Sequence, residues 1–472
     1  MRTIYRSLAI GCALAMGMAA AQQQPATPAK KQSQPAKTAP ESPKKVTPLT
    51  ALRGGRVMTV SHGTIENGVV VMQNGRISVV GGPETSIPRG ARVIDAKGMV
   101  VYPGLIDSET QLGLTEISAV DMTNDLVEPS DNIMPHMHVY DAFHAESELI
   151  PVTRINGVTH AVVAAGNRDS LPGQSALVQL AGPSSEEMIL VRDLALPVNF
   201  NGRQRRNESF DRAKFPFTRM GVIAQLRQAF IDALDYQRKL DDCAKKPAES
   251  KPEAEAKDGE KKEGRGASGC PPKRDLKHEA LLPYLGGAKP VVLSAEEPSD
   301  IKVALRLAEE FKLKVILNRV TYSQRMIDEL AAAKLPVIIS TFYEDPKDED
   351  RYDVVFRLPA ELQKRGVKIA FATSDAHNVR NLPYEAGYAA GWGMPYDAAM
   401  RAITLNPAEI WGVADQLGSL DVGKMANVVV ANGDPLDVRT DVKHVFIAGE
   451  EVPLVSRQTE LRDMYWPRPA AR

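Results

Sequence analysis

The chain has 472 residues and a formal net charge of −1, with 43% hydrophobic and 25% charged residues. This length suits one large domain with a smaller one, and the composition is that of a globular protein. The near-neutral charge provides no overall field that would attract nucleic acid or an anionic membrane, so we expect neither as a partner.

The first 21 residues have the pattern of a secretory signal peptide. Two arginines precede an apolar stretch over residues 7–20, and the alanines at 19–21 supply the small residues of a cleavage site. A membrane anchor needs about 20 apolar residues, and this stretch is shorter. Too few apolar residues precede Cys12 to favour a lipoprotein. We therefore expect a periplasmic or secreted protein with no membrane insertion after signal removal.

Two tracts have compositions that cannot bury a core. Residues 22–48 are rich in Gln, Pro, Ala, Lys and Thr, which predicts a disordered linker. A charged insertion at about 243–273 is bracketed by Cys243 and Cys270. In an oxidising compartment these cysteines are expected to form a disulfide, with two unpaired thiols as the alternative.

Short β patterns occur near both ends of the chain. Residues 56–60, 68–72, 76–80 and 91–95 alternate with turn residues such as Asn74-Gly75, and similar patterns return at 426–431 and 444–447. We expect residues 49–104 and 413–455 to form one small β-sandwich domain, followed by a C-terminal tail over 456–472.

Between these ends, apolar strand patterns alternate with amphipathic helical patterns. The candidate strands are residues 99–106, 158–164, 290–293, 313–317, 336–339 and 367–372, and the candidate helices are 217–240, 300–311, 323–333, 354–364 and 395–404. Two strands are harder to place, and 176–180 and 188–194 are the candidates. The alternation predicts an α/β fold, a (β/α)8 TIM-like barrel over residues 105–412, in preference to an open doubly wound sheet.

Three segments carry a family resemblance. Val101–Asp107 looks like the entry into a first barrel strand, and Thr404–Glu409 and Gly418–Asn427 look like the exit from a barrel into a sheet. Together the chain resembles the amidohydrolase superfamily over roughly residues 52–455, most closely the imidazolonepropionase-like branch of cyclic amidohydrolases. These segments are scaffold, so they indicate a fold more than a reaction.

The resemblance implies a divalent metal, zinc or manganese, at the C-terminal face of the barrel, where it lowers the pKa of bound water. Such enzymes usually start this site with His-x-His on the first strand, because alternate residues share a face. Glu109 and Gln111 occupy the matching positions here, and Ser294 and Asn318 stand where further histidines are usual. The metal site is therefore expected to be degenerate, with no metal as the alternative.

Asp375 is the residue that matches the family pattern well. It follows the strand at 367–372, where the resemblance implies a metal ligand that acts as general base. A site made of Asp375, Glu109 and water is one hypothesis, and a capping or hydrogen-bonding role for Asp375 at the barrel rim is the other.

Histidines elsewhere give weaker signals. His377 lies two residues after Asp375 in a loop expected over the barrel mouth, so we consider it a candidate for substrate binding or for a helix start. The remaining candidates are disfavoured as metal ligands, since they are lone residues or, for the His-x-His pair, follow a loop; they are His136, His138, His144 and His160. The loops at 166–169 and 172–175 are expected to be connections or to shape a polar pocket.

The leading functional hypothesis is an exported amidohydrolase-type hydrolase that acts on non-peptide C–N bonds of a small amide or cyclic amide. The alternative is a catalytically inactive binding protein, or pseudoenzyme, that lacks the metal centre. A metal-free hydrolase of polysaccharides or peptides would need two acids flanking one cleft, and only Glu109 and Asp375 qualify. The sequence is compatible with a homo-oligomer and does not determine the oligomeric state.

Overall fold

The computed structural model describes residues 48–200, 215–245, 270–340, 342–346 and 350–466. The expected signal peptide, almost all of the expected linker and most of the charged insertion lie outside these residues. Among the described residues, no helix has the length and apolarity that crossing a membrane requires.

The sheet that forms the barrel has eight strands in the order β13-β12-β11-β10-β9-β8-β7-β6. Its strands are β6 (Leu105–Thr110), β7 (Val158–Val163), β8 (Ser175–Gln179), β9 (Ile189–Asn199), β10 (Pro290–Ser294), β11 (Lys314–Asn318), β12 (Val337–Ile339) and β13 (Ile369–Phe371). Both hard-to-place strands are present, as β8 and β9. The TIM-like barrel is thus confirmed, with one departure from a uniformly parallel sheet.

That departure is β8, which runs antiparallel to both of its neighbours, β7 and β9. Only residues 164–174 separate β7 from β8. A parallel crossover needs a dozen or more residues and usually a helix. The chain therefore turns back directly, and the other seven strands keep one direction.

The barrel closes between its first and last strands. Beyond β13, the amide of Ser374 donates to the carbonyl of Glu109 at 3.0 Å, and the amide of Gln111 donates to the carbonyl of Asp375 at 3.3 Å. The interior is filled by one layer of apolar side chains from successive strands, including Ile106, Val162, Val292, Ile316 and Ile338, with Trp411 and Leu417 packed against them. The strand ends that follow this layer form the barrel mouth.

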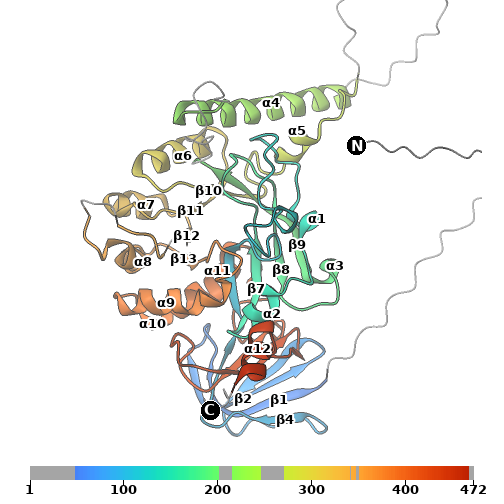
Figure 1. Ribbon diagram of the computed structural model, residues 1–472, viewed down its shortest axis with the longest axis vertical. Helices are drawn as coiled ribbons and strands as arrows, with labels where there is room; N and C mark the ends of the chain where they lie inside the picture. The colour runs from blue at the N-terminus through green and yellow to red at the C-terminus, as the bar shows by residue number, and fades with distance from the viewer. Residues whose placement is uncertain (1–47, 201–214, 246–269, 341, 347–349, 467–472) are drawn as a thin grey trace, which may run out of the picture. The chain divides into compact units, whose positions relative to one another are not determined.

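Helices pack on the outside of this sheet. They are α1 (Val139–Ala142), α2 (Leu149–Arg154), α3 (Ser185–Met188), α4 (Arg219–Lys245), α5 (Leu276–Leu281), α6 (Pro298–Glu310), α7 (Ile327–Ala333), α8 (Val354–Lys364), α9 (Leu382–Gly391), α10 (Tyr396–Ala402) and α11 (Leu405–Ile410). Figure 1 shows α6, α7, α8 and α9 stacked in chain order along one side of the barrel. A separate helix, α12 (Arg457–Tyr465), follows the last strand.

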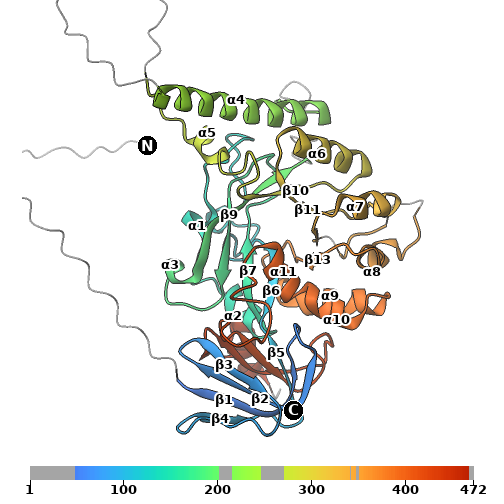
Figure 2. The same cartoon turned by 180° about the vertical axis from the view of Figure 1, so that it is seen from behind.

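The second sheet joins the two ends of the described chain. Its strands are β1 (Thr50–Met58), β2 (Thr64–Gln73), β3 (Arg76–Gly81), β4 (Arg92–Asp95), β5 (Val100–Pro103), β14 (Val428–Ala431), β15 (Val442–Ile447) and β16 (Glu450–Glu451). β14 pairs antiparallel with β5, which links the N-terminal and C-terminal segments (Figure 2). Alternate residues of β2 enter two different apolar clusters, Val70 and Met72 in one and Val69 and Val71 in the other.

The Pro103-Gly104 pair forms the passage from this sheet into the barrel. A Cβ atom on Gly104 would lie 2.2 Å from Oγ1 of Thr159 on β7. No other residue type fits there without displacing that side chain, which explains why glycine follows Pro103.

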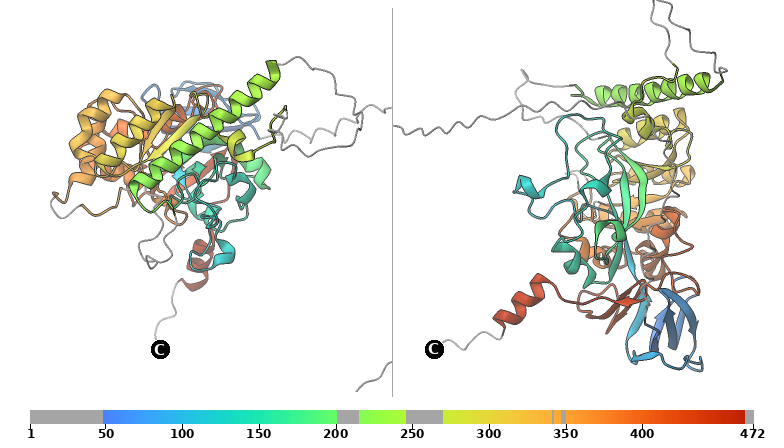
Figure 3. Two further views of the ribbon diagram at one scale, coloured as in Figure 1. Left: turned by 90° about the horizontal axis from the view of Figure 1, so that it is seen from above. Right: turned by 90° about the vertical axis from the view of Figure 1, so that its right-hand side faces the viewer.

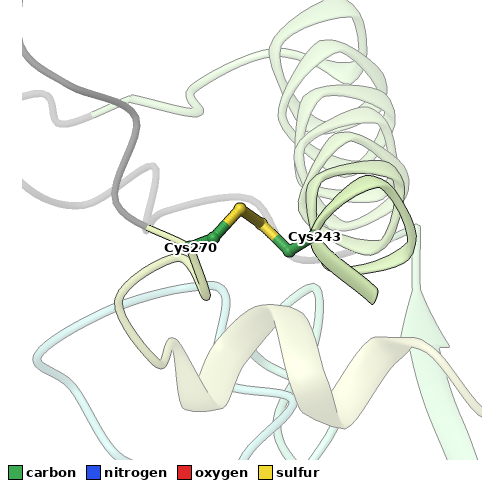
Figure 4. Close-up of a disulfide and its surroundings, with 2 residues drawn as sticks. All are labelled: Cys243 and Cys270. Atoms are coloured by element: carbon green, nitrogen blue, oxygen red, sulfur yellow. A yellow bond between two sulfur atoms is a disulfide. The ribbon is translucent and has the colours of Figure 1, made fainter. Parts of the chain in front are cut away.

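The expected disulfide is present between Cys243 and Cys270, with a Cα–Cα distance of 5.4 Å (Figure 4). Cys243 lies in the last turn of α4. The bond therefore fixes both ends of the charged insertion next to α4.

Candidate functional site

Polar side chains gather at the C-terminal ends of the parallel barrel strands. Glu109 comes from β6, Ser294 ends β10, Asn318 ends β11, and Ser340 and Ser374 follow β12 and β13. Since the parallel strands of a barrel share a direction, these ends meet at one face, where the active sites of such barrels lie.

Glu109 is the centre of a hydrogen-bond network at this face. Nδ2 of Asn318 donates to Oε2 of Glu109 at 2.5 Å, and Oγ of Ser374 donates to Oε1 at 3.0 Å. The hydroxyl of Ser340 donates to Oδ1 of Asn318 at 2.6 Å, which fixes the amide orientation. Three strand ends therefore hold one carboxylate in place.

Burial raises the pKa of Glu109 above its ordinary value, and the charge of Arg319 and the two hydrogen bonds oppose this rise. Arg319 directly follows Asn318, and its Nε donates to Oε1 of Glu296 at 2.9 Å. A carboxylate whose pKa moves toward neutrality is better suited to accept a proton from water.

Asp375 lies at the same barrel end but is bonded to its own loop. Its Oδ1 accepts from the amides of His377 and Asn378, at 2.5 and 3.1 Å, and its Oδ2 accepts from Nδ2 of Asn378 at 3.2 Å. The Asp375 carbonyl accepts from Oγ1 of Thr110 on β6 at 2.6 Å. The side chain thus shapes the loop that leads into α9, while 39% of it stays exposed.

His377 anchors a second loop over the mouth. Its Nε2 lies 2.9 Å from the carbonyl oxygen of Glu116, in the long connection after β6, and its Nδ1 lies 3.7 Å from Oδ1 of Asp375. The imidazole is 43% exposed, so a ligand at the mouth has access to it.

The other sequence candidates take part in local contacts. Nδ1 of His138 lies 2.6 Å from Oδ1 of Asp193, and the His138 ring stacks on Tyr140. His160 is buried on β7 with Nδ1 2.8 Å from the Thr159 hydroxyl, and burial lowers its pKa to about 3. A neutral buried imidazole of this kind is a packing residue.

The mouth residues do not fit a zinc or manganese ion of the kind the resemblance implies. In the parts of the chain that the structure describes, no three His, Cys, Asp or Glu residues lie close enough to hold a metal together. The Asp375 carboxylate accepts from the amides of its own loop, the His377 imidazole contacts the carbonyl of Glu116, and Asn318 turns its amide nitrogen toward Glu109. Zinc needs imidazole, thiolate or carboxylate ligands that converge on one point, so this arrangement is unsuitable.

Asp107 is a buried acid that the sequence reasoning did not single out. Its Oδ2 accepts from Oγ1 of Thr373 at 2.5 Å, and its Oδ1 accepts from the amides of Thr373 and Glu109 at 3.2 and 3.1 Å. Burial raises its pKa to about 7 against these hydrogen bonds. Asp107 thereby links β6 to the segment after β13, beside Glu109. An acidic residue within an apolar strand is rare, and this pattern in the sequence could have identified Asp107.

Asp169 is a second acid with a perturbed environment. It lies in the loop after β7, and Nδ2 of Asn199, at the end of β9, donates to its carbonyl at 2.8 Å. Burial raises its pKa to about 6, and its Oδ2 has no hydrogen-bond partner among the described residues. The loop at 166–169 thus contributes a polar group near the strand ends.

Comparisons with known proteins agree with this architecture. The model of the Amidohydrolase family matches residues 312–452. The solved structure of an amidohydrolase from Thermotoga maritima superposes with a TM-score of 0.76 at 25% identity, covering 86% of this chain and 100% of that one. The chain therefore resembles the amidohydrolase superfamily in both sequence and fold. Its place in the imidazolonepropionase-like branch stays a prediction.

Two curated relatives add detail. The amidohydrolase tasK of Hapsidospora irregularis is 24% identical over 399 residues, which is 81% of this chain. The chain spans only 39% of the length of tasK. A dihydroorotase of Syntrophus aciditrophicus is 34% identical over 61 residues, 13% of this chain and 14% of that enzyme.

Proposed function

We propose that this chain is an exported hydrolase that cleaves the C–N bond of a small amide or cyclic amide at the barrel mouth, with Glu109 as the proton-transfer group. The observation that carries the proposal is the placement of Glu109 as a partly buried carboxylate held by Asn318 and Ser374 at the face where this fold performs chemistry. The likeness to amidohydrolases supports the reaction class.

The chemistry follows from the raised pKa of Glu109. The carboxylate takes a proton from a water molecule while the water oxygen bonds to the amide carbon. The resulting carboxyl group returns that proton to the nitrogen as the C–N bond breaks. Proton and electron pairs balance over the two steps, and Glu109 ends as it began.

Asp375 and His377 take supporting roles in this proposal. Asp375 positions the loop after β13, because its carboxylate already accepts hydrogen bonds from that loop. His377, half exposed beside it, provides a polar contact for the substrate. Asp375 as the base, the role implied by the family pattern, remains the alternative within the same site.

Export is supported by the disulfide as well as by the N-terminal pattern. Disulfides persist in oxidising compartments and are rare in the cytosol of most organisms. The bond between Cys243 and Cys270 therefore fits a periplasmic or secreted location.

A second candidate is ligand binding without hydrolysis. The hydrogen bond from the Asn318 amide to Glu109 favours it, because this bond occupies one oxygen of the carboxylate. In that case the mouth recognises an amide through the same polar groups and releases it unchanged.

The test compares wild type with Glu109→Gln and Asp375→Asn on a panel of small linear and cyclic amides. Hydrolysis is followed by amine release and binding by calorimetry, with the exposed-surface variant Asp415→Asn as control. We expect Glu109→Gln to abolish turnover while binding persists. Loss of turnover in Asp375→Asn alone would transfer the base role to Asp375. Binding without turnover in wild type would support the second candidate and overturn the first.

A further inference from the structure

Helix α12 is a short, exposed helix near the end of the described residues. Its N-terminus is closed by a capping box between Ser456 and Thr459, yet none of its residues is buried. The right-hand view of Figure 3 shows it projecting away from the rest of the described chain. Isolated helices shorter than about 12–15 residues are marginal in water, so a nine-residue helix of this kind requires a covering surface.

The exposed side of α12 is apolar along one stripe. Leu461, Met464 and Tyr465 are spaced by three and four positions, so they share a helix face, and Trp466 follows directly. Met464, Tyr465 and Trp466 are 66%, 68% and 75% exposed. We call these four residues the α12 face.

The same chain has an open aromatic cleft. It has a volume of about 530 Å³ and lies between α9 and the connection from β14 to β15. Its lining includes Tyr388, Trp392, Tyr396, Leu436 and Val438, and we call this cleft the aromatic groove. Val438 is 71% exposed and Tyr388 is 52% exposed, so the groove also lacks a cover.

Charge at the two surfaces is complementary. Asp434 borders the aromatic groove, where it accepts from the hydroxyl of Tyr396 at 2.7 Å and from the amide of Leu436 at 2.9 Å. Within the described residues Asp434 makes no ion pair. On α12, Arg462 pairs with the adjacent Asp463 and with no other acid among the described residues, and both side chains are about two-thirds exposed.

We propose that a second copy of this chain covers these surfaces, with the α12 face of each copy seated in the aromatic groove of the other. Met464 then lies against aromatic rings, a favourable sulfur–aromatic contact, and Arg462 approaches Asp434. Because the contact is reciprocal, it closes into a two-fold dimer. A membrane surface is a poorer occupant, since Arg457, Glu460, Arg462 and Asp463 leave α12 without net charge.

Sedimentation of the chain lacking residues 1–21 tests this directly. We expect a dimer for wild type and monomers for Met464→Glu and Val438→Glu, each with a dissociation constant raised about 30-fold or more, as for a hot-spot residue. Met220→Glu is the matched control, because Met220 is 80% exposed on α4, away from both surfaces, and should leave the dimer intact. Circular dichroism spectra of the monomeric variants that match the wild-type spectrum exclude misfolding.

Two further samples test the pairing itself. A mixture of Met464→Glu and Val438→Glu retains one intact helix and one intact groove, so it should form a heterodimer. Asp434→Arg should dissociate the dimer, and Arg462→Asp in the same chain should restore it. A wild-type monomer at tens of micromolar, whether or not it binds anionic vesicles, overturns the proposal, as does a Met464→Glu dimer. The readout is mass, so it is independent of any hydrolytic activity.

Discussion

Replacing Asp107 by asparagine should change how stability depends on pH. Asp107 is completely buried and accepts hydrogen bonds from Thr373 and from the amide of Glu109. Asparagine has the same shape, its Oδ1 keeps both backbone donors, and its Nδ2 donates to the Thr373 hydroxyl. The substitution therefore removes the titrating group with little change in packing.

The magnitude follows from the pKa of Asp107, which burial raises from 3.8 to about 7. The folded protein holds this proton more tightly than the unfolded chain does. The resulting stabilisation is fully present below about pH 4 and is lost as the pH rises through about 7. Each pKa unit corresponds to about 1.36 kcal/mol, so the side chain accounts for a loss of about 4 kcal/mol of unfolding free energy between pH 4 and pH 8.

Urea unfolding at a series of pH values provides the measurement. We expect the unfolding free energy of Asp107→Asn minus that of wild type to increase by about 4 kcal/mol from pH 4 to pH 8, so the variant gains stability relative to wild type. The surface variant Asp415→Asn should show no such trend. A difference between Asp107→Asn and wild type that is the same at every pH would refute the reasoning, because Asp107 would then titrate normally.

Three other predictions concern stability. Glu385 on α9 is buried, its Oε2 has no hydrogen-bond partner among the described residues, and burial raises its pKa well above the ordinary value. Glu385→Gln should therefore raise the thermal midpoint at pH 8 more than at pH 5, and an equal change at both would contradict this. Gly104→Ala should cost about 1–3 kcal/mol in urea unfolding, because the added Cβ meets the Thr159 side chain; wild-type stability would remove the steric explanation. Cys243→Ser should lower the unfolding free energy by about 3 kcal/mol, as expected for a closed loop of this size, and reduction of wild type should reproduce that loss.

Strand placement was predictable from the sequence because apolar runs and turn residues are local signals. The expected strands at 290–293, 313–317 and 336–339 correspond to β10, β11 and β12. The direction of β8 was not predicted, since periodicity carries no direction. Its antiparallel direction follows from the connection after β7, which is too short for a parallel crossover.

The candidate site was predictable in its residues but not in its contacts. Glu109, Asn318 and Asp375 were identified at the barrel mouth, yet the bond between Asn318 and Glu109 joins residues 209 positions apart. Such a contact depends on strand register. The pairing of β6 with β7 has a register shift between Asp107 and Thr110 that the sequence pattern does not predict. The bonding of Asp375 to its own loop likewise depends on local backbone geometry.

The central claim is that Glu109, without a transition metal, carries out C–N hydrolysis at the barrel mouth. The most direct measurement is amide turnover by chelator-treated protein, with metal content determined on the same sample by elemental analysis. The account predicts turnover that persists at substoichiometric zinc and manganese and disappears in Glu109→Gln. Stoichiometric metal together with turnover that the chelator abolishes and added zinc or manganese restores would contradict it.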